Sequence, residues 1–169
     1  MTLFLAIWGA FLSSVTFGWN LFRDLRDRAK LKLRIRVRRI GVGQNGKGYA
    51  ISPDLPIAGA SSELYLVARA VNIGRRPMQW EGWGGEYYEE RNGRKGFVIV
   101  GEDLPKMLAE RESHSERTLL EGGWLPNVKR LFIWDASGKS WKLSLWQMHK
   151  LRTEAEKALR ENTAQPSTE

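Results

Sequence analysis

A chain of 169 residues with a net charge of +8 and no cysteine provides material for one globular domain. The absence of cysteine excludes a disulfide framework, a thiolate zinc site and a cysteine nucleophile. A hydrophobic content of 42% with charges of both signs excludes an intrinsically disordered chain.

The first predicted element is an uncharged hydrophobic stretch of twenty-one residues, Thr2 to Phe22. A helix of this length covers roughly the 30 Å hydrocarbon core of a bilayer. A cleaved signal would need a basic segment before a shorter apolar run, and a buried core helix would need a larger domain around it. An interfacial helix would need a polar face. We therefore expect residues 1–22 to form a single transmembrane helix.

Nearly all of the excess positive charge directly follows this stretch. Between Arg23 and Ile40, nine Lys or Arg residues stand against two Asp residues. Because positive segments stay inside, this asymmetry predicts a single-pass protein of the inner (cytoplasmic) membrane, with the N-terminus outside and the domain in the cytoplasm. Residues 23–30 are expected to form a basic juxtamembrane helix or linker. Four of its cations either contact anionic lipid or only set the topology: Arg23, Arg26, Arg28 and Lys30.

One face of the predicted membrane helix carries small residues at every fourth position, namely Ala6, Ala10, Ser14 and Gly18. Such a row lets another helix backbone approach closely. Self-association, or docking on another membrane protein, is therefore one hypothesis. The other is that the row arises by chance, because small residues are common in membrane helices.

Residues 31–145 show the alternation and turn signals of an antiparallel β-domain. From Leu31 to Arg38, apolar and basic residues alternate, which predicts a half-buried strand with a basic outer face. Residues 41–48, with Asn45-Gly46, predict a hairpin connection. Further strands are expected at 49–52, 63–73, 78–88 and 96–100, and in a hairpin of 128–134 with 140–145.

The remaining parts of residues 31–145 give weaker signals. We expect a loop at 53–62, a loop with one helical turn at 104–112, and the start of a strand at 119–120. Seven or so short strands with regular turn signals predict an immunoglobulin-like β-sandwich in architecture, without its cysteine pair.

From Leu145 the apolar period becomes helical, which predicts a short C-terminal helix at 146–161. Its apolar side is formed by Met148, Leu151, Ala155, Ala158 and Leu159. Arg152, Glu156 and Arg160 are spaced four apart and are expected to pair on the other side. The polar residues 162–169 are predicted to be a disordered tail.

The layout resembles a group of small, uncharacterised bacterial or phage proteins in which one membrane helix precedes a β-sandwich. Two motifs carry the resemblance, VARAVNIGRRP (Val67 to Pro77) and LFIWDASGKSWKL (Leu131 to Leu143). Both motifs are structural. The resemblance therefore implies a fold and no reaction.

The sequence offers no catalytic, cofactor or metal-binding motif. His114 and His149 are the only histidines, and neither is followed by a ligand partner three or four residues later. Ser113 to Ser115 lacks a nucleophile elbow, and Glu86 to Glu90 is typical of a strand end with solvated charges. We therefore expect a protein that is not an enzyme and has no cofactor.

Arg75 and Arg76, close to Trp80 and Trp83, form the strongest candidate for partner or ligand contact. Arginine with aromatic residues serves nucleic-acid stacking, carbohydrate stacking or a protein hot spot. The alternative is that residues 72–77 form a turn and the tryptophans fill the core.

Three functional hypotheses follow. The first is a membrane-anchored, non-enzymatic interaction module that displays a β-sandwich at the cytoplasmic face of a bacterial membrane. The second is a nucleic-acid or small-ligand binder that uses the basic strand 32–39 and the Arg75/Arg76/Trp80/Trp83 region. The third is an enzyme that uses His114 or the glutamates at 86–90. We favour the first, with the bilayer as the expected partner rather than nucleic acid.

Overall fold

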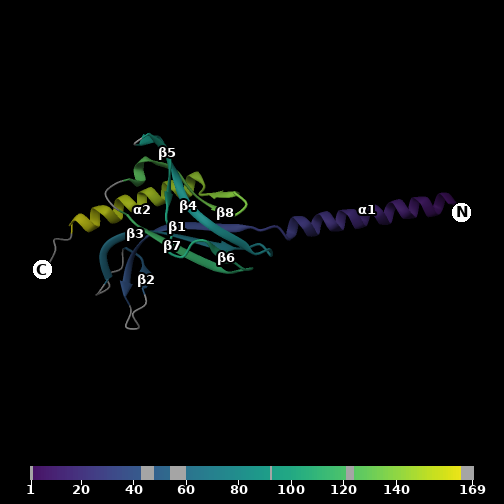
Figure 1. Ribbon diagram of the computed structural model, residues 1–169, viewed down its shortest axis with the longest axis horizontal. Helices are drawn as coiled ribbons and strands as arrows, with labels where there is room; N and C mark the ends of the chain where they lie inside the picture. Colours follow the sequence, from purple (N-terminus) through teal and green to yellow (C-terminus); the bar gives the residue numbers. More distant parts are fainter. Residues whose placement is uncertain (1, 43–47, 54–59, 92, 121–123, 165–169) are drawn as a thin grey trace.

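The computed structural model describes residues 2–42, 48–53, 60–91, 93–120 and 124–164. Its elements in chain order are α1 (Thr2–Arg26), β1 (Leu31–Val42), β2 (Gly48–Ile51), β3 (Ala60–Asn72), β4 (Met78–Arg91), β5 (Arg94–Ile99), β6 (Lys106–Leu108), β7 (Ser113–Leu119), the 3-10 turn η1 (Leu125–Asn127), β8 (Val128–Asp135), β9 (Ser140–Lys142) and α2 (Leu145–Ala164). Figure 1 shows α1 projecting away from the strands, whereas α2 lies against them.

The strands form two antiparallel sheets in a sandwich-like arrangement, which confirms the predicted mainly-β class. The first sheet has the order β2-β1-β3-β7, and the second has the order β5-β4-β8-β9 with β6 also paired to β4. Residues of both sheets meet in one buried core, with Val37 and Leu66 from the first sheet and Trp83 and Ile133 from the second. The immunoglobulin-like type is not confirmed. Its constant-type four-stranded sheet has the chain order 1-2-5-4, which differs from both orders here.

The alternation of apolar and basic residues in β1 buries one face of the strand, as predicted. Leu33, Ile35 and Val37 are buried, whereas Lys32 and Arg34 are exposed. β3 pairs with β1 along most of its length and with β7 on its other side, so it is a central strand as expected. The predicted hairpin of β8 and β9 is also present, with Ile133 opposite Trp141.

Two segments differ from the sequence-based expectation. Within 104–112, Lys106–Leu108 forms a strand, and Leu108 lies opposite Met78 of β4 and is fully buried. Leu119 ends strand β7 instead of beginning a strand. In β7, the alternate residues Ser113, Ser115 and Arg117 are exposed, so one face of this strand is solvated. Its polar sequence therefore hides the strand signal.

The C-terminal helix packs its predicted apolar side into the core. Met148, Leu151, Ala155 and Ala158 are buried in α2. Arg152 donates hydrogen bonds to the backbone oxygen of Val128 at 2.6 Å and to the hydroxyl of Tyr88 at 3.0 Å. These contacts tie α2 to β8 and β4. The pairing of Glu156 with Arg160 within the helix stays a prediction.

Some expectations lie outside the described residues. The Asn45-Gly46 turn falls within 43–47, although the pairing of Val42 with Gly48 closes the β1–β2 hairpin around it. The expected loop at 53–62 lies mostly within the undescribed residues 54–59, and its last residues begin β3. Helix α2 extends to Ala164, so the predicted tail overlaps the helix, and its residues 165–169 are outside the described part.

Helix α1 is longer than the expected membrane segment and continues to Arg26. Among the described residues, however, no helix is long and apolar enough to cross a membrane. The expected transmembrane helix at 1–22 is therefore not confirmed. Residues such as Ser13, Ser14 and Asn20 lower the mean hydropathy of this helix, although none of them is charged.

Candidate functional site

Helix α1 carries an extended exposed apolar surface. Eleven large hydrophobic side chains of this helix are between 49% and 75% exposed, namely Leu3, Phe4, Ile7, Trp8, Phe11, Leu12, Val15, Phe17, Trp19, Leu21 and Phe22. Monomeric soluble proteins rarely expose a contiguous patch of this kind, and such patches mark interaction with a partner or a membrane. The small residues Ala6, Ala10, Ser14 and Gly18 are also exposed.

A network of hydrogen bonds and ion pairs joins the C-terminal end of α1 to the loop between β3 and β4. We call residues 24–30 together with 72–76 the junction. The backbone N–H groups of Ile73 and Gly74 donate to the carbonyl oxygen of Lys30 at 2.8 and 3.1 Å. A Cβ atom on Gly74 would lie 2.4 Å from the Lys30 nitrogen, so only glycine fits there. The junction therefore holds the start of β1 close to the β3–β4 loop.

A buried asparagine shapes this loop. Asn72 is fully buried, and its side-chain amide donates to the backbone oxygens of Arg76 at 2.9 Å and Leu108 at 3.1 Å. Its side-chain oxygen accepts from the Gly74 N–H at 3.0 Å. Asn72 thus satisfies two backbone groups of the loop and one of β6.

The predicted group of Arg75, Arg76, Trp80 and Trp83 does not form one surface. Both tryptophans are fully buried in the core, in agreement with the packing alternative. The two arginines are exposed and pair with acidic residues at the end of α1, Arg75 with Asp27 at 3.4 Å and Arg76 with Asp24 at 3.0 Å. The arginines are therefore junction contacts.

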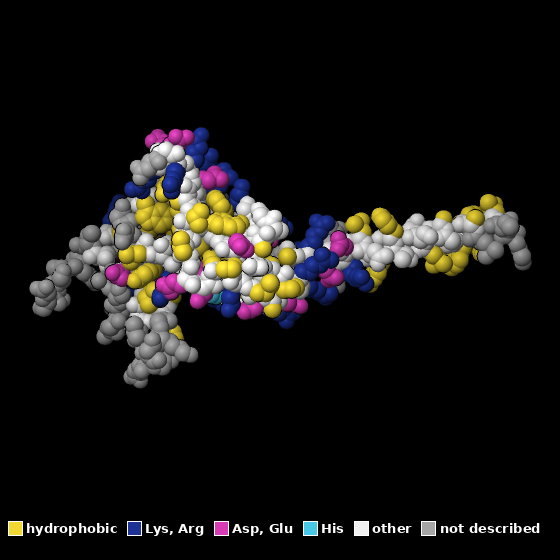
Figure 2. Space-filling view, viewed as in Figure 1, with side chains coloured by type: hydrophobic (Ala, Val, Ile, Leu, Met, Phe, Trp, Pro, Cys, Tyr) yellow, Lys and Arg dark blue, Asp and Glu magenta, His cyan; other side chains and the backbone are white. Residues whose placement is uncertain are grey.

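Cations gather around the junction, as Figure 2 shows where α1 meets the domain. Of the predicted lipid contacts, Arg23, Arg28 and Lys30 are exposed there. The side chain of Arg26 lies outside the described part. The basic side chains further along β1 are used differently, because Arg36 and Arg38 each pair with Glu154 of α2 at 3.2 Å and Arg39 donates to Asn162.

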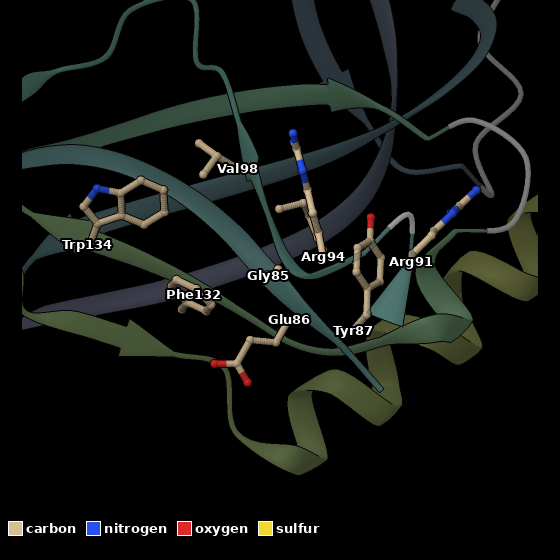
Figure 3. Close-up of a pocket in the computed structure, with 10 residues that line it drawn as sticks. Gly85, Glu86, Tyr87, Arg91, Arg94, Val98, Phe132 and Trp134 are labelled. Atoms are coloured by element: carbon tan, nitrogen blue, oxygen red, sulfur yellow. The ribbon is translucent and has the colours of Figure 1, made fainter. Parts of the chain in front are cut away.

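An open groove of about 910 Å³ lies on the outer face of the second sheet (Figure 3). Phe132 and Trp134 of β8 form its apolar side, together with Val98 of β5. The Trp134 ring covers Gly82, because a Cβ atom there would lie 2.3 Å from the indole. The groove is therefore a sheet surface on which glycine leaves room for aromatic rings.

The opposite part of this groove is polar. Arg91 and Arg94 line it, and Glu86 is paired with Arg130 at 3.1 Å. Glu90 pairs with Lys95 at 3.4 Å, so two of the glutamates considered for catalysis, Glu86 and Glu90, belong to separate ion pairs on the surface. The groove offers stacking and guanidinium contacts, which suit binding rather than acid–base chemistry.

Sequence reasoning missed this groove. In the run Leu131 to Trp134 all four residues are apolar, and alternation along the strand buries Leu131 and Ile133. The other two, Phe132 and Trp134, therefore face outward. The period of two was the available signal, but nothing in the sequence indicated which pair faces the core.

A second polar cluster surrounds His114, the histidine considered for catalysis. His114 Nε2 lies 2.7 Å from Glu116 Oε1, and Glu116 is buried. The Glu116 carboxylate also accepts the N–H groups of Glu102 at 3.0 Å and Asp103 at 3.3 Å. The ligand atoms of Asp103, His114 and Glu116 lie within 4.8 Å of one another, which is the donor set of a possible metal site.

This cluster is explained by hydrogen bonding alone. Both oxygens of Glu116 have donors, and Asp103 is exposed. The His114 ring packs edge-on against Trp80, with ring centroids 5.7 Å apart. Glu116 therefore acts as a buried acceptor that fixes the loop at 102–103 against β7. Ser113 is used elsewhere, because its hydroxyl accepts a hydrogen bond from Arg69 at 3.0 Å.

Comparisons of this chain with protein-family models, with curated protein sequences and with solved structures found no match. They add no support to the resemblance carried by Val67 to Pro77 and Leu131 to Leu143. The exposed α1, the junction and the surfaces of the domain are the features of this chain that bear on its function.

Proposed function

We propose that the protein is a membrane-tethered, non-enzymatic interaction module. In this proposal α1 is a single-pass anchor in the inner membrane of a bacterial cell, and the domain faces the cytoplasm. The two-sheet domain, immunoglobulin-like in its architecture, presents its open groove to a partner near the bilayer. The observation that carries the proposal is the exposure of the large apolar side chains on α1.

Exposure on this scale calls for an apolar environment outside the chain. An isolated helix is marginal in water even with favourable residues, because tertiary packing normally stabilises it. The described large hydrophobic side chains of α1 are exposed, so the domain supplies little of that packing. Lipid satisfies the requirement, since the stretch Thr2 to Phe22 carries no charge and the basic residues follow it directly.

The polar side chains within α1 are compatible with lipid. The Ser14 hydroxyl donates to the Ala10 carbonyl at 2.9 Å, and the Thr16 hydroxyl donates to the Leu12 carbonyl at 2.8 Å. A hydroxyl that is bonded to its own helix leaves no unsatisfied donor, which reduces the cost of placing it in hydrocarbon. These residues lower the mean hydropathy of the helix, but their bonded hydroxyls oppose insertion only weakly.

Membrane fractionation of the full-length tagged protein tests the anchor. We expect the wild type in the membrane pellet after carbonate washing, and the double variant Phe11→Lys/Val15→Lys in the supernatant. Each lysine at the centre of a membrane helix costs about 3 kcal/mol, or about a hundredfold in insertion. The matched control Phe11→Leu/Val15→Leu keeps the helix apolar and should stay in the pellet. Wild-type protein in the supernatant would refute the anchor.

Orientation is tested separately with a tag at the C-terminus. We expect external protease to leave this tag intact in spheroplasts and to remove it after lysis, since the cations after α1 resist translocation. Removal of the tag from intact spheroplasts would place the domain on the opposite side.

The row of small residues in α1 is the proposed contact for self-association or for another membrane helix. The chain has no native cysteine, so single cysteines from Ala6 to Gly18 can be introduced one at a time. We expect crosslinking to peak at Ala6, Ala10, Ser14 and Gly18 and to fall between them, because these positions share a face. A flat profile would remove the row as a contact.

A further inference from the structure

A cationic pocket of about 280 Å³ lies between the first half of β1 and the first turns of α2. Its charged lining comes from Lys32, Arg34 and Arg36 of β1 and from Lys150 of α2. Trp146 forms part of the wall, and Lys150 Nζ lies 5.4 Å from the centroid of its ring. The pocket therefore combines four cations with an aromatic side chain.

Three of these cations lack an acidic partner among the described residues. Arg36 pairs with Glu154 at 3.2 Å. For Lys32, Arg34 and Lys150, the described part of the chain shows no ion pair with a carboxylate. Lys32 and Arg34 are held side by side on the exposed face of β1 by its alternation, and Lys150 joins them from α2. The resulting positive potential favours a ligand with a negative charge.

Two exposed apolar residues begin α2: Trp146, which lines the pocket, and Leu145, which directly precedes it in the chain. Leu145 is 85% exposed and Trp146 is 69% exposed at the beginning of α2. The described part of the chain therefore leaves both side chains largely open to solvent. Tryptophan is enriched at the interface between lipid and water, where the ring lies among the headgroups. A cationic pocket next to an exposed Leu-Trp pair matches the combination of phosphate and acyl chain at a bilayer surface.

We propose that this pocket, with Leu145 and Trp146, is a second membrane contact that binds the phosphate of anionic lipid headgroups. The inference rests on the proposed function, because the anionic lipid belongs to the leaflet on the domain side, where α1 leaves the membrane. Lys32 follows the last residue of α1, Arg26, by six residues, a reach of at most roughly 20 Å. Charge complementarity and this short connection select lipid over other anions. Docking there would lay the domain against the bilayer.

The test uses the full-length protein in nanodiscs. In the variant Leu145→Cys, a polarity-sensitive dye is attached at a single site, because the chain has no other cysteine. We expect its emission to shift to the blue in nanodiscs that contain phosphatidylserine and not in phosphatidylcholine alone. The shift should be lost at high salt, because surface charges are then screened. The same dye on Val98→Cys, in the groove of the second sheet, should not respond.

Replacement of the pocket cations by neutral glutamine tests which of them contribute to the membrane contact. In the labelled protein, each of Lys32→Gln, Arg34→Gln and Lys150→Gln should weaken docking by about fivefold. A control triple variant, Lys106→Gln/Lys129→Gln/Lys142→Gln, removes the same charge from exposed positions elsewhere and should dock like the parent. Equal loss in the pocket triple variant Lys32→Gln/Arg34→Gln/Lys150→Gln and in this control would overturn the pocket as the binding site.

The remaining outcomes separate this inference from the anchor. Co-elution with both types of nanodisc, but no shift or an equal shift in both, overturns the inference and leaves the proposed function in place. Failure to co-elute with either type overturns both. A shift caused by inorganic phosphate without any bilayer assigns the pocket to a soluble anion, and also overturns the inference.

Discussion

Tryptophan occupies opposite environments in the two parts of this molecule. Trp80 and Trp83 in the domain are fully buried, whereas Trp8 and Trp19 in α1 are 54% and 65% exposed. In the domain, burial of such side chains stabilises the fold by about 25 cal/mol for each Å² of apolar surface. In α1 more than half of each tryptophan stays exposed, so the same residue type contributes less of this kind within the chain. The buried core therefore stabilises the domain itself, whereas we expect the stability of α1 to depend on what surrounds it.

The largest expected effect comes from replacing one tryptophan of the domain by alanine, in comparison with the same replacement in α1. Trp83→Ala should lower the free energy of unfolding of the domain by about 3–5 kcal/mol, because it leaves a cavity in the core. Trp8→Ala should leave it unchanged. Denaturant titrations of both full-length variants in mild detergent, followed by near-UV circular dichroism, measure the difference. Equal losses would mean that α1 is part of the cooperative fold.

The junction is where the two parts meet, and Gly74→Ala should disturb it. The new Cβ would lie 2.4 Å from the Arg28 oxygen, so the backbone must shift, at a cost of about 1–3 kcal/mol. We expect faster tryptic cleavage at Arg28 and Lys30, measured by mass spectrometry. Gly9→Ala is the matched control, since its Cβ meets nothing within 4 Å and should leave the cleavage rate as it is.

A buried polar group tests whether the domain is held by hydrogen bonds as well as by its core. Glu116→Ala removes the acceptor of the Glu102 and Asp103 N–H groups and the partner of His114. We expect a loss of about 1–3 kcal/mol in the free energy of unfolding. Glu116→Gln keeps an acceptor and should cost less in the same denaturant titration. An unchanged midpoint for the alanine variant would show that water replaces the carboxylate.

The exposed ion pairs of the junction should have the smallest effect. In a double-mutant cycle, Arg76→Ala with Asp24→Ala should give a coupling of less than about 1 kcal/mol, because both side chains are exposed. The coupling should shrink further as salt is added. A coupling of about 2 kcal/mol or more, independent of salt, would show that this pair is sequestered from water.

Part of the candidate site was predictable because its signals are local. The uncharged stretch Thr2 to Phe22 and the cations behind it are read directly from the sequence, and α1 and the exposed junction cations lie where these signals place them. The alternation in Leu31 to Arg38 and the helical period after Leu145 likewise depend on near neighbours. Burial of Trp80 and Trp83 followed from the usual role of aromatic residues in strands.

Local signals determined the class of the fold, the main strands and the C-terminal helix, because side-chain periodicity reflects which face of an element is buried. Only the tertiary structure decided that Lys106–Leu108 pairs with β4, that Phe132 and Trp134 face outward, and that Arg75 pairs with Asp27. The cationic pocket also belongs to this second group, since Lys150 and Lys32 are far apart in the chain. Contacts between distant segments depend on sheet order and packing, and a periodic pattern within one segment contains no information about its partner.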